Sequence, residues 1–375
     1  MTAAALLALV IWAYLLLFHG GFWRADQRDS ADAPAPRTWP AVTAIVPARD
    51  EAAVIGRSVA SLLAQDYPGP LRLIVVDDGS SDGTAEVATR AAAGDPRLQV
   101  IGGAPLPASW TGKLWALEQG VRREGETVPW LWFSDADIVH APDTLASLVA
   151  RAEADGLVLN SLMAKLECEA PAEHALIPAF IFFFAMLYPF GRVNRPGRTA
   201  AAAGGCMLIR RDALHRAGGL FRIAQAIIDD CAMGRALKEQ GPIRLSLTRR
   251  SESVRPYAGW RGIGAMIARS AYAQLRYSPL LLLGTVLGMG LVYLAPPVAA
   301  LFGRGLARGA GLAAWGLMAL AFQPTLRFYR RSPLWGVVLP LIASFYTAAT
   351  LQSAWAYARG RGGMWKGRAQ AAVGA

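Results

Sequence analysis

The sequence is poor in charged residues and in cysteine. Only 17% of its 375 residues are charged, whereas 54% are hydrophobic, and the mean hydropathy is +0.30. A soluble protein of this length carries more charge, so the composition predicts membrane segments beside one or two folded domains. The cysteines are odd in number and form no CxxC pair. This argues against a disulfide framework and a zinc site, and it fits a reducing, cytoplasmic setting for Cys168, Cys206 and Cys231.

Acidic residues are the rarer of the two charged kinds. The chain has 38 Lys and Arg against 27 Asp and Glu, a formal net charge of +11 and a pI of about 10.0. No stripe of basic residues interleaved with aromatics accompanies this excess, so nucleic acid is not an expected partner. In so apolar a chain, the basic residues are better suited to anionic membrane lipids and phosphate-bearing substrates.

The first apolar run lacks the features of a cleaved signal peptide. No Lys or Arg precedes residues 2–18, whereas Arg24 and Arg28 follow them. A secretory signal has a basic start and a small-residue cleavage site. We therefore expect residues 1–22 to be an uncleaved transmembrane anchor whose C-terminal side faces the cytoplasm. An Ala- and Pro-rich linker is expected over residues 23–40.

Residues 279–358 form a second apolar region. Within it, 280–302 and 333–357 are long enough to span a membrane, whereas 310–323 is short. We expect three hydrophobic elements here. The distribution of Lys and Arg leaves open on which side of the membrane the basic tail, residues 359–375, lies.

A shorter apolar run, residues 176–190, interrupts the central part of the chain. Pro178 and Pro189 lie near its two ends. Its length favours an interfacial or buried helix over a membrane span.

Residues 41–278 alternate between short β-rich runs and helical patterns. VTAIVP (42–47) and LRLIVVDD (71–78) are typical of buried strands, and each is followed by a helical stretch. This alternation indicates βαβ units, which means a Rossmann-like α/β fold with a mostly parallel sheet and helices on both faces. In such sheets ligands bind beyond the carboxyl ends of the strands. Four acidic residues fall at those ends, namely Asp77, Asp78, Asp135 and Asp137.

Two of these carboxylates, Asp135 and Asp137, leave one strand with a single residue between them. Alone they would repel each other, and a divalent cation removes that repulsion while bridging to phosphate oxygens. All-oxygen ligands favour Mg²⁺ or Mn²⁺, which can stabilise the leaving diphosphate of a nucleotide-sugar. We expect Lys113, near a helix start, to add positive charge on the phosphates. Asp77 and Asp78 are placed to accept hydrogen bonds from a base or ribose.

A further acidic pair, Asp229 and Asp230, begins a helical segment, where the helix dipole favours ionised carboxylates. An acceptor hydroxyl must lose its proton to a base, and Asp230 is our candidate for that role, although a plain helix-start role stays open for both residues. We interpret His140 as a surface-loop histidine rather than a metal ligand. Cys206 and Cys231 are interpreted as small buried residues rather than nucleophiles.

Six motifs occur in one order along the chain: VPARDE, VVDDGSSDGT, GK before a helix, SDAD, GGCMLIRRDAL and DDCAMGRALKEQG. Over about residues 41–277 they resemble an inverting family-2 glycosyltransferase of the GT-A fold. The flanking apolar segments add a resemblance to ceramide glucosyltransferase-like enzymes. The segment SAYAQLRYSPL, after a GW-containing loop, resembles hopanoid-biosynthesis-associated glycosyltransferases. The resemblance implies a GT-A domain with transmembrane helices at both ends.

The resemblance also implies roles for individual residues. Asp135 and Asp137 would hold the metal, the second more directly, and Asp230 would be the catalytic base. The base and ribose of a UDP-sugar would contact Pro47, Ala48, Glu51 and Asp78, with Gly204 and Gly205 in an acceptor-side loop.

One family element, (Q/R)xxRW, is imperfect in this chain. Gln274 is one place off and Arg276 is followed by Tyr277 instead of Trp, and we assign these three residues to the acceptor side. The departure favours a single sugar transfer over processive polysaccharide synthesis. A non-enzymatic membrane scaffold with a degenerate domain is a second rival, against which the intact acidic residues argue. We predict a multi-pass protein of the bacterial cytoplasmic membrane with a cytoplasmic catalytic domain and a lipid acceptor, a hopanoid or a related lipid.

Overall fold

The computed structural model describes residues 1–363. Residues 364–375, most of the predicted basic tail, lie outside the described residues. The chain divides into two compact units, each described by itself below. They are a sheet unit of Gln27–Glu167 and Arg192–Pro256, and a helical unit of Met1–Asp26, Cys168–Gly191 and the residues from Tyr257 onward.

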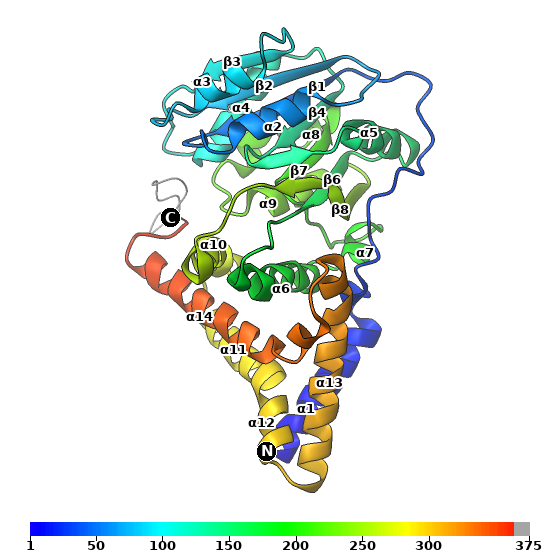
Figure 1. Ribbon diagram of the computed structural model, residues 1–375, viewed down its shortest axis with the longest axis vertical. Helices are drawn as coiled ribbons and strands as arrows, with labels where there is room; N and C mark the ends of the chain where they lie inside the picture. Colours follow the sequence, from blue (N-terminus) through cyan, green and yellow to red (C-terminus); the bar gives the residue numbers. More distant parts are fainter. Residues whose placement is uncertain (364–375) are drawn as a thin grey trace. The chain divides into compact units, whose positions relative to one another are not determined.

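An eight-stranded sheet forms the centre of the sheet unit (Figure 1): β1 (Val42–Ala48), β2 (Leu71–Asp77), β3 (Leu98–Gly102), β4 (Trp130–Ser134), β5 (Ile138–His140), β6 (Leu159–Lys165), β7 (Cys206–Arg210) and β8 (Ile243–Ser253). The spatial order is β3-β2-β1-β4-β7-β6-β8-β5. The first four strands in this order are parallel, as are β6 and β8, whereas β7 and β5 run antiparallel to their neighbours. The predicted α/β fold with a mostly parallel sheet is confirmed.

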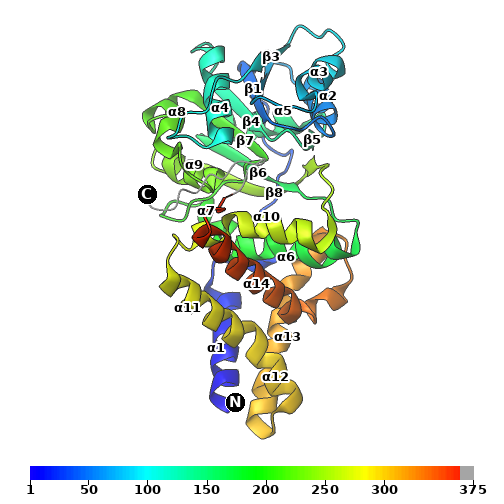
Figure 2. The same cartoon turned by 90° about the vertical axis from the view of Figure 1, so that its left-hand side faces the viewer.

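Helices cover both faces of this sheet. Figure 2 shows α2 (Ile55–Leu63), α3 (Thr84–Ala91) and α5 (Thr144–Ala154) on one face, and α4 (Gly112–Glu124), α8 (Arg211–Arg216) and α9 (Asp229–Lys238) on the other. Successive strand side chains point to opposite faces. Accordingly, Ala44 and Val46 of β1 share one core cluster with residues of α2 and α5, whereas Ile45 faces Gly120 of α4. Every residue of β1 is therefore buried, as expected for a strand covered on both faces.

The antiparallel strand β7 brings a loop to the carboxyl edge of the parallel strands. Cys206, its first residue, pairs with Ser134, the last residue of β4. Gly204 and Gly205, which precede β7, therefore lie near Asp135, which follows β4. Strand pairing thus places the predicted acceptor-side loop beside the predicted metal ligands.

The helical unit contains α1 (Thr2–Phe18), α6 (Pro171–Leu187), α10 (Gly259–Gln274), α11 (Pro279–Met289), α12 (Ala295–Phe302), α13 (Gly305–Phe328) and α14 (Leu339–Ala358). A π-helical turn over Gly290–Leu294 joins α11 to α12. The indole N–H of Trp12 donates to the carbonyl of Val292 at 2.9 Å, and its ring packs edge-on against Tyr293. These contacts hold α1 against the π-helical turn. The shorter elements of the chain are α7 (Phe190–Val193) and 3₁₀ turns at Phe22–Arg24, Leu220–Ile223 and Pro333–Gly336.

Among the described residues, three helical segments are long and apolar enough to cross a membrane: Pro171–Val193, Pro279–Phe302 and Gly305–Phe328. The second of these is the span expected over 280–302. The first is longer than the apolar run 176–190, because α6 begins at Pro171; half of it is buried, so the expectation of an interfacial or buried helix stays a prediction. The third corrects the expectation for 310–323, because α13 continues through Arg308 at one end and Arg327 at the other.

The expected spans at the N-terminus and over 333–357 are not among these three segments. α1 has 17 residues, which is about 26 Å of helix against a hydrocarbon core of about 30 Å. α14 has 20 residues but includes Thr347, Thr350, Gln352 and Ser353, which lower its hydropathy. The candidate spans among the described residues therefore lie between Pro171 and Phe328 and not at both ends of the chain.

A glycine allows α9 to lie close to the segment before β7. A Cβ on Gly234 would be 2.7 Å from the backbone carbon of Ala201 and 2.9 Å from the backbone nitrogen of Ala202. We expect Gly234→Ala to push α9 outward and to lower the free energy of unfolding by about 1–3 kcal/mol. Thermal unfolding of the detergent-solubilised full chain measures this. Gly102→Ala is the control, since no described atom lies within 4 Å of its Cβ position, and equal unfolding temperatures for the two variants would contradict the prediction.

Candidate functional site

One ammonium group and three carboxylates meet at the carboxyl edge of the sheet. Lys113 is the second residue of α4, Asp135 follows β4, and Asp229 and Asp230 begin α9. Lys113 Nζ lies 2.8 Å from Asp135 Oδ1 and 3.1 Å from Asp229 Oδ2. The side chains of Lys113 and Asp229 are only 17% and 12% exposed, so water screens this ion pair weakly. We call these four residues the Lys113 cluster.

The Lys113 cluster shifts the pKa values of its members. Burial alone would lower the pKa of Lys113, but Asp135 and Asp229 outweigh burial and hold it well above its ordinary value. Burial raises the pKa of Asp135, the Lys113 ammonium opposes that rise, and Asp137 adds to it. Lys113 therefore stays charged at physiological pH, and it binds carboxylates of the chain itself. Its contact with donor phosphates remains a prediction.

Asp230 is held by two backbone N–H groups. Gly204 donates to Oδ2 at 3.0 Å and Cys231 donates to Oδ1 at 2.7 Å. Burial and the neighbouring Asp229 raise the pKa of Asp230 to about 6, against the opposing effects of Lys113 and the two N–H groups. Such a carboxylate is mainly ionised at pH 7 and takes up a proton more readily than an ordinary aspartate, which suits a general base.

Gly204 packs tightly against both groups. A Cβ at this position would lie 3.0 Å from Lys113 Nζ and 3.5 Å from Asp230 Cβ. The absence of a side chain therefore lets the backbone N–H reach the Asp230 carboxylate.

A second ion-pair cluster at this edge is centred on Arg255, which no sequence motif marks. Arg255 Nη2 lies 2.6 Å from each carboxylate oxygen of Glu51, and its Nε lies 3.1 Å from Asp137 Oδ2. Ser253 Oγ donates to the same oxygen of Asp137 at 2.9 Å. Glu51, Asp137 and Arg255 come soon after β1, β4 and β8, so the guanidinium joins three strand ends. Its partners could not be read from the sequence because they lie more than 100 residues away.

The residues predicted to line the nucleotide pocket lie together at the ends of β1 and β2. Pro47 and Ala48 are the last residues of β1, and the backbone N–H of Asp78 donates to the Ala48 carbonyl at 2.8 Å. Asp78 is buried beside Arg49, whose Nη1 lies 3.9 Å from Asp78 Oδ2. Asp77 Oδ1 accepts a hydrogen bond from the backbone of the following turn. The structure brings these residues together, and their contact with a nucleotide remains a prediction.

The acidic pair after β4 fits a divalent cation that is shared with a substrate. Within residues 1–363, no group of three or more His, Cys, Asp or Glu side chains is arranged to hold a metal ion by itself. Asp135 uses Oδ1 in its ion pair and Asp137 uses Oδ2, so Asp135 Oδ2 and Asp137 Oδ1 take part in neither pair. Mg²⁺ is commonly bound by one or two carboxylates together with substrate phosphates and water. The donor set therefore fits a cation that binds together with a diphosphate.

Three predicted acceptor-side residues belong to the helical unit. Gln274 ends α10 and exchanges hydrogen bonds with the hydroxyl of Tyr188 at 2.8–3.0 Å. Arg276 and Tyr277 have φ values of 52° and 55°, in the left-handed region. The Tyr277 ring stacks on Tyr357 with 4.4 Å between centroids. These contacts give Gln274 and Tyr277 structural roles in the helical unit, and their acceptor contact remains a prediction.

Our interpretation of His140 as a surface-loop residue is wrong. His140 ends β5, is 3% exposed, and its ring hydrogen-bonds to Ser134 Oγ at 2.9 Å and Ser251 Oγ at 2.8 Å. Burial lowers the pKa of His140 to about 3, so its ring is neutral. The pairing of β5 with the distant β8 buries it, and this pairing leaves no local signal in the sequence. The three cysteines are buried, as expected.

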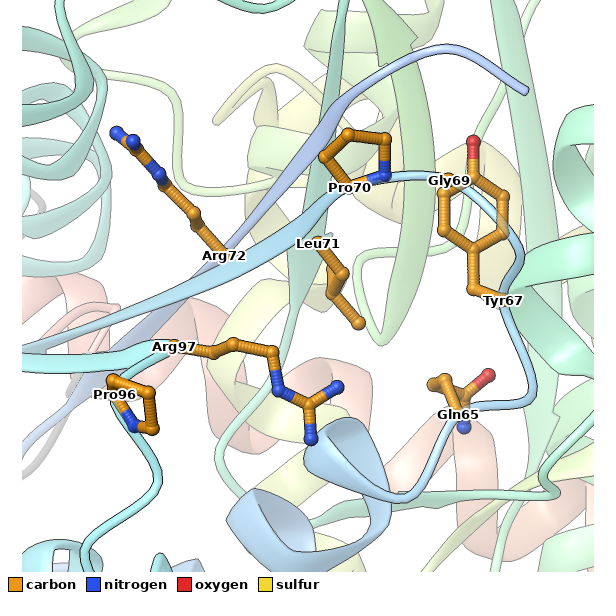
Figure 3. A pocket seen from close by; sticks show the side chains of 8 residues that line it. All are labelled: Gln65, Tyr67, Gly69, Pro70, Leu71, Arg72, Pro96 and Arg97. Carbon is orange, nitrogen blue, oxygen red and sulfur yellow. The ribbon is translucent and has the colours of Figure 1, made fainter. Parts of the chain in front are cut away.

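A cavity of about 390 Å³ lies at the opposite, amino edge of the sheet (Figure 3). Of its two basic residues, Arg72 and Arg97, the second is already paired with Asp95 and donates to the Leu63 carbonyl at 2.7 Å. Ligands of parallel sheets bind at the carboxyl edge, where the acidic groups Asp135 and Asp230 with raised pKa also lie, so we place the functional site there. The cavity is lined by Gln65, Tyr67, Gly69, Pro70, Leu71, Arg72, Pro96 and Arg97.

Fold and site together define an α/β protein with a charge-lined site at the carboxyl ends of a mostly parallel sheet. Residues 43–218, just under half of the chain, match the family model described as Glycosyl transferase family 2.

Relatives and solved structures add to this match. The chain is similar to an N-acetylglucosaminyltransferase of Mesorhizobium japonicum, with 31% identity over 190 residues, 49% of this chain and 43% of the relative. An N-acetylglucosaminyltransferase of Rhizobium leguminosarum bv. viciae is 30% identical over 179 residues, 47% and 40% of the two chains. The chain thus spans less than half the length of these relatives. A mannosyltransferase from Pyrobaculum calidifontis, solved with GDP-Man and Mn²⁺, is 22% identical, has a TM-score of 0.59 and matches 95% of this chain and 99% of its own, which supports the fold.

Removing the charge of Lys113 tests the Lys113 cluster. In Lys113→Met, partly buried carboxylates lose their cation, and we expect the free energy of unfolding at pH 7.5 to fall by about 1–3 kcal/mol. The loss should shrink as the pH falls to 5.5, because carboxyl groups whose pKa is raised in the folded state become neutral there. Thermal unfolding at both pH values measures this. Lys165→Met, which breaks an exposed pair with Glu252, is the control. If Lys113→Met lowers the free energy of unfolding equally at both pH values, the prediction is contradicted.

Proposed function

We propose that the chain is a membrane-bound, inverting glycosyltransferase. It moves a sugar from a nucleotide-sugar, a UDP-sugar in our interpretation, to a lipid acceptor. The observation that carries this proposal is the position of Asp230, a partly buried carboxylate of raised pKa, beside Lys113 and Asp135 at the carboxyl edge of the sheet. The similar N-acetylglucosaminyltransferases, and the mannosyltransferase solved with GDP-Man and Mn²⁺, support this class of reaction.

On the donor side, the ends of β1 and β2 receive the nucleoside and the end of β4 receives the diphosphate. Asp135 and Asp137 would hold Mg²⁺ or Mn²⁺, which when bound neutralises the diphosphate and stabilises it as the leaving group. Lys113 keeps Asp135 in place and adds positive charge near the phosphates. The nucleoside pocket consists of Pro47, Ala48, Glu51, Asp77 and Asp78.

On the acceptor side, Asp230 removes the proton from the attacking hydroxyl. Each of its oxygens accepts one backbone N–H and keeps a lone pair for the hydroxyl proton. The proton moves to Asp230 as the acceptor oxygen forms its bond to the sugar and the bond to the diphosphate breaks. One displacement of this kind inverts the anomeric centre. Asp229, paired with Lys113, raises the basicity of its neighbour.

The acceptor we propose is the hydroxyl of a membrane lipid, by resemblance a hopanoid or a related lipid. Three helices of spanning length and an exposed apolar surface on α11 and α12 support a membrane location. Nucleotide-sugars are made in the cytoplasm, so we place the sheet unit on the cytoplasmic side of the bacterial inner membrane. The incomplete element at Gln274, Arg276 and Tyr277 favours one transfer per acceptor.

Two substitutions test the assigned roles. Asp230→Asn removes the base, and Asp137→Ala removes a cation ligand, so we expect each to lower transfer by about 10²–10⁴-fold. UDP release and sugar-lipid formation by detergent-solubilised protein, with and without Mn²⁺, measure this. Asp212→Asn, which breaks only exposed pairs with Arg210 and Arg216, should retain activity. Wild-type activity in both site variants would refute the assignment.

The pH dependence of kcat/KM tests Asp230 independently. Asp230 acts as a base only when ionised, and burial raises its pKa to about 6. We therefore expect kcat/KM to be constant above pH 7 and to fall tenfold per unit of pH below about 6. An acidic limb centred near pH 4, the range of an unperturbed aspartate, would contradict this role.

A further inference from the structure

Arg255 connects two parts of the proposed donor site. One is Glu51, in the nucleoside pocket, and the other is Asp137, the more direct of the expected cation ligands. The guanidinium reaches Glu51 through Nη2 and Asp137 through Nε, at 2.6 Å and 3.1 Å. The side chains of Glu51 and Asp137 are 9% and 16% exposed and that of Arg255 is 35% exposed, so the two carboxylates lie largely out of water while the guanidinium is partly exposed.

Each partner of Arg255 is also fixed by its own backbone. The N–H of Glu51 donates to Thr84 Oγ1 at 2.8 Å, which ties it to the start of α3. The carbonyl of Asp137 accepts the N–H of Val254 at 2.9 Å, next to Arg255 itself. The two carboxylates therefore stand on different loops with fixed backbones, and Arg255 is the side chain that contacts both of them.

We infer that Arg255 is a positioning residue that couples the nucleoside pocket to the cation site. The inference rests on the proposed function. The guanidinium is planar and presents donors in a fixed fork, so it holds two carboxylates at a constant separation. Its bond is to Asp137 Oδ2, so Oδ1 takes no part in this ion pair and would serve as a ligand for the cation.

A direct charge effect would behave differently from positioning. If Arg255 only attracted the diphosphate, Arg255→Lys would bind the donor nearly as well as the wild type. Under positioning, Arg255→Lys fails, because an ammonium has no fixed fork. Positioning also predicts that Glu51→Gln weakens binding, whereas removing a negative charge would by itself strengthen the binding of an anion.

The experiment is isothermal titration of UDP, with Mn²⁺ present, into the detergent-solubilised full chain. We expect Arg255→Gln, Arg255→Lys and Glu51→Gln each to weaken UDP binding by about 10- to 100-fold. The double variant of Arg255→Gln with Glu51→Gln should bind no more weakly than either single variant, because both remove the same link. Arg250→Gln is the matched control: Arg250 lies on β8 and also bridges two carboxylates, Asp29 and Asp143, and this change should leave the affinity unaltered.

Each other outcome overturns the inference. Rescue by Arg255→Lys, or additive losses in the double variant, would show direct and independent contacts with the ligand. If the wild type binds UDP and the single variants bind it equally well, Arg255 has no part in donor binding, and the proposed function still stands. Failure of the wild type to bind UDP or GDP with Mn²⁺ would overturn the proposed function and the inference together.

Discussion

The ion pairs of Lys113 with Asp135 and Asp229 are the interaction on which the site depends. A lysine at the start of α4 is disfavoured by the helix dipole, at a cost of about 0.3–1 kcal/mol. Opposite charges 4 Å apart near a protein surface attract by about 4 kcal/mol, and here two such charges lie closer than that. The attraction therefore outweighs the dipole, and it fixes the starts of α4 and α9 and the end of β4 relative to one another. Asp230 follows Asp229 at the start of α9, so its position depends on these ion pairs.

The spacing of Asp135 and Asp137 divides the site into two halves. Asp135 pairs with Lys113, beside the proposed base, and Asp137 pairs with Arg255, beside the nucleoside pocket. The two residues lie in the turn between β4 and β5, where the N–H of Ile138 donates to the Asp135 carbonyl, and each carboxylate has its own positive partner. One short segment after β4 thus links the side where the donor binds to the side where the acceptor is activated.

The sequence predicts those features that have a local cause. Alternating β-rich and helical stretches indicate the sheet, and the acidic residues at strand ends indicate its functional edge, because both follow from residue periodicity and chain direction. Arg255 and the burial of His140 escape prediction because they depend on pairing between β5 and β8, more than 100 residues apart. The length of α13 could not be predicted, because Arg308 and Arg327 lie outside the apolar run although the helix continues through them.

The central claim is that a nucleotide-sugar and its cation bind at the carboxyl edge of the sheet unit, between the Lys113 cluster and Arg255. The most direct test is an experimental structure of the full chain with UDP and Mn²⁺. The account predicts the cation on Asp137, the diphosphate beside Lys113 and the nucleoside against Glu51 and Asp78. A nucleotide bound instead at the amino edge, in the cavity lined by Arg72 and Arg97, would contradict it.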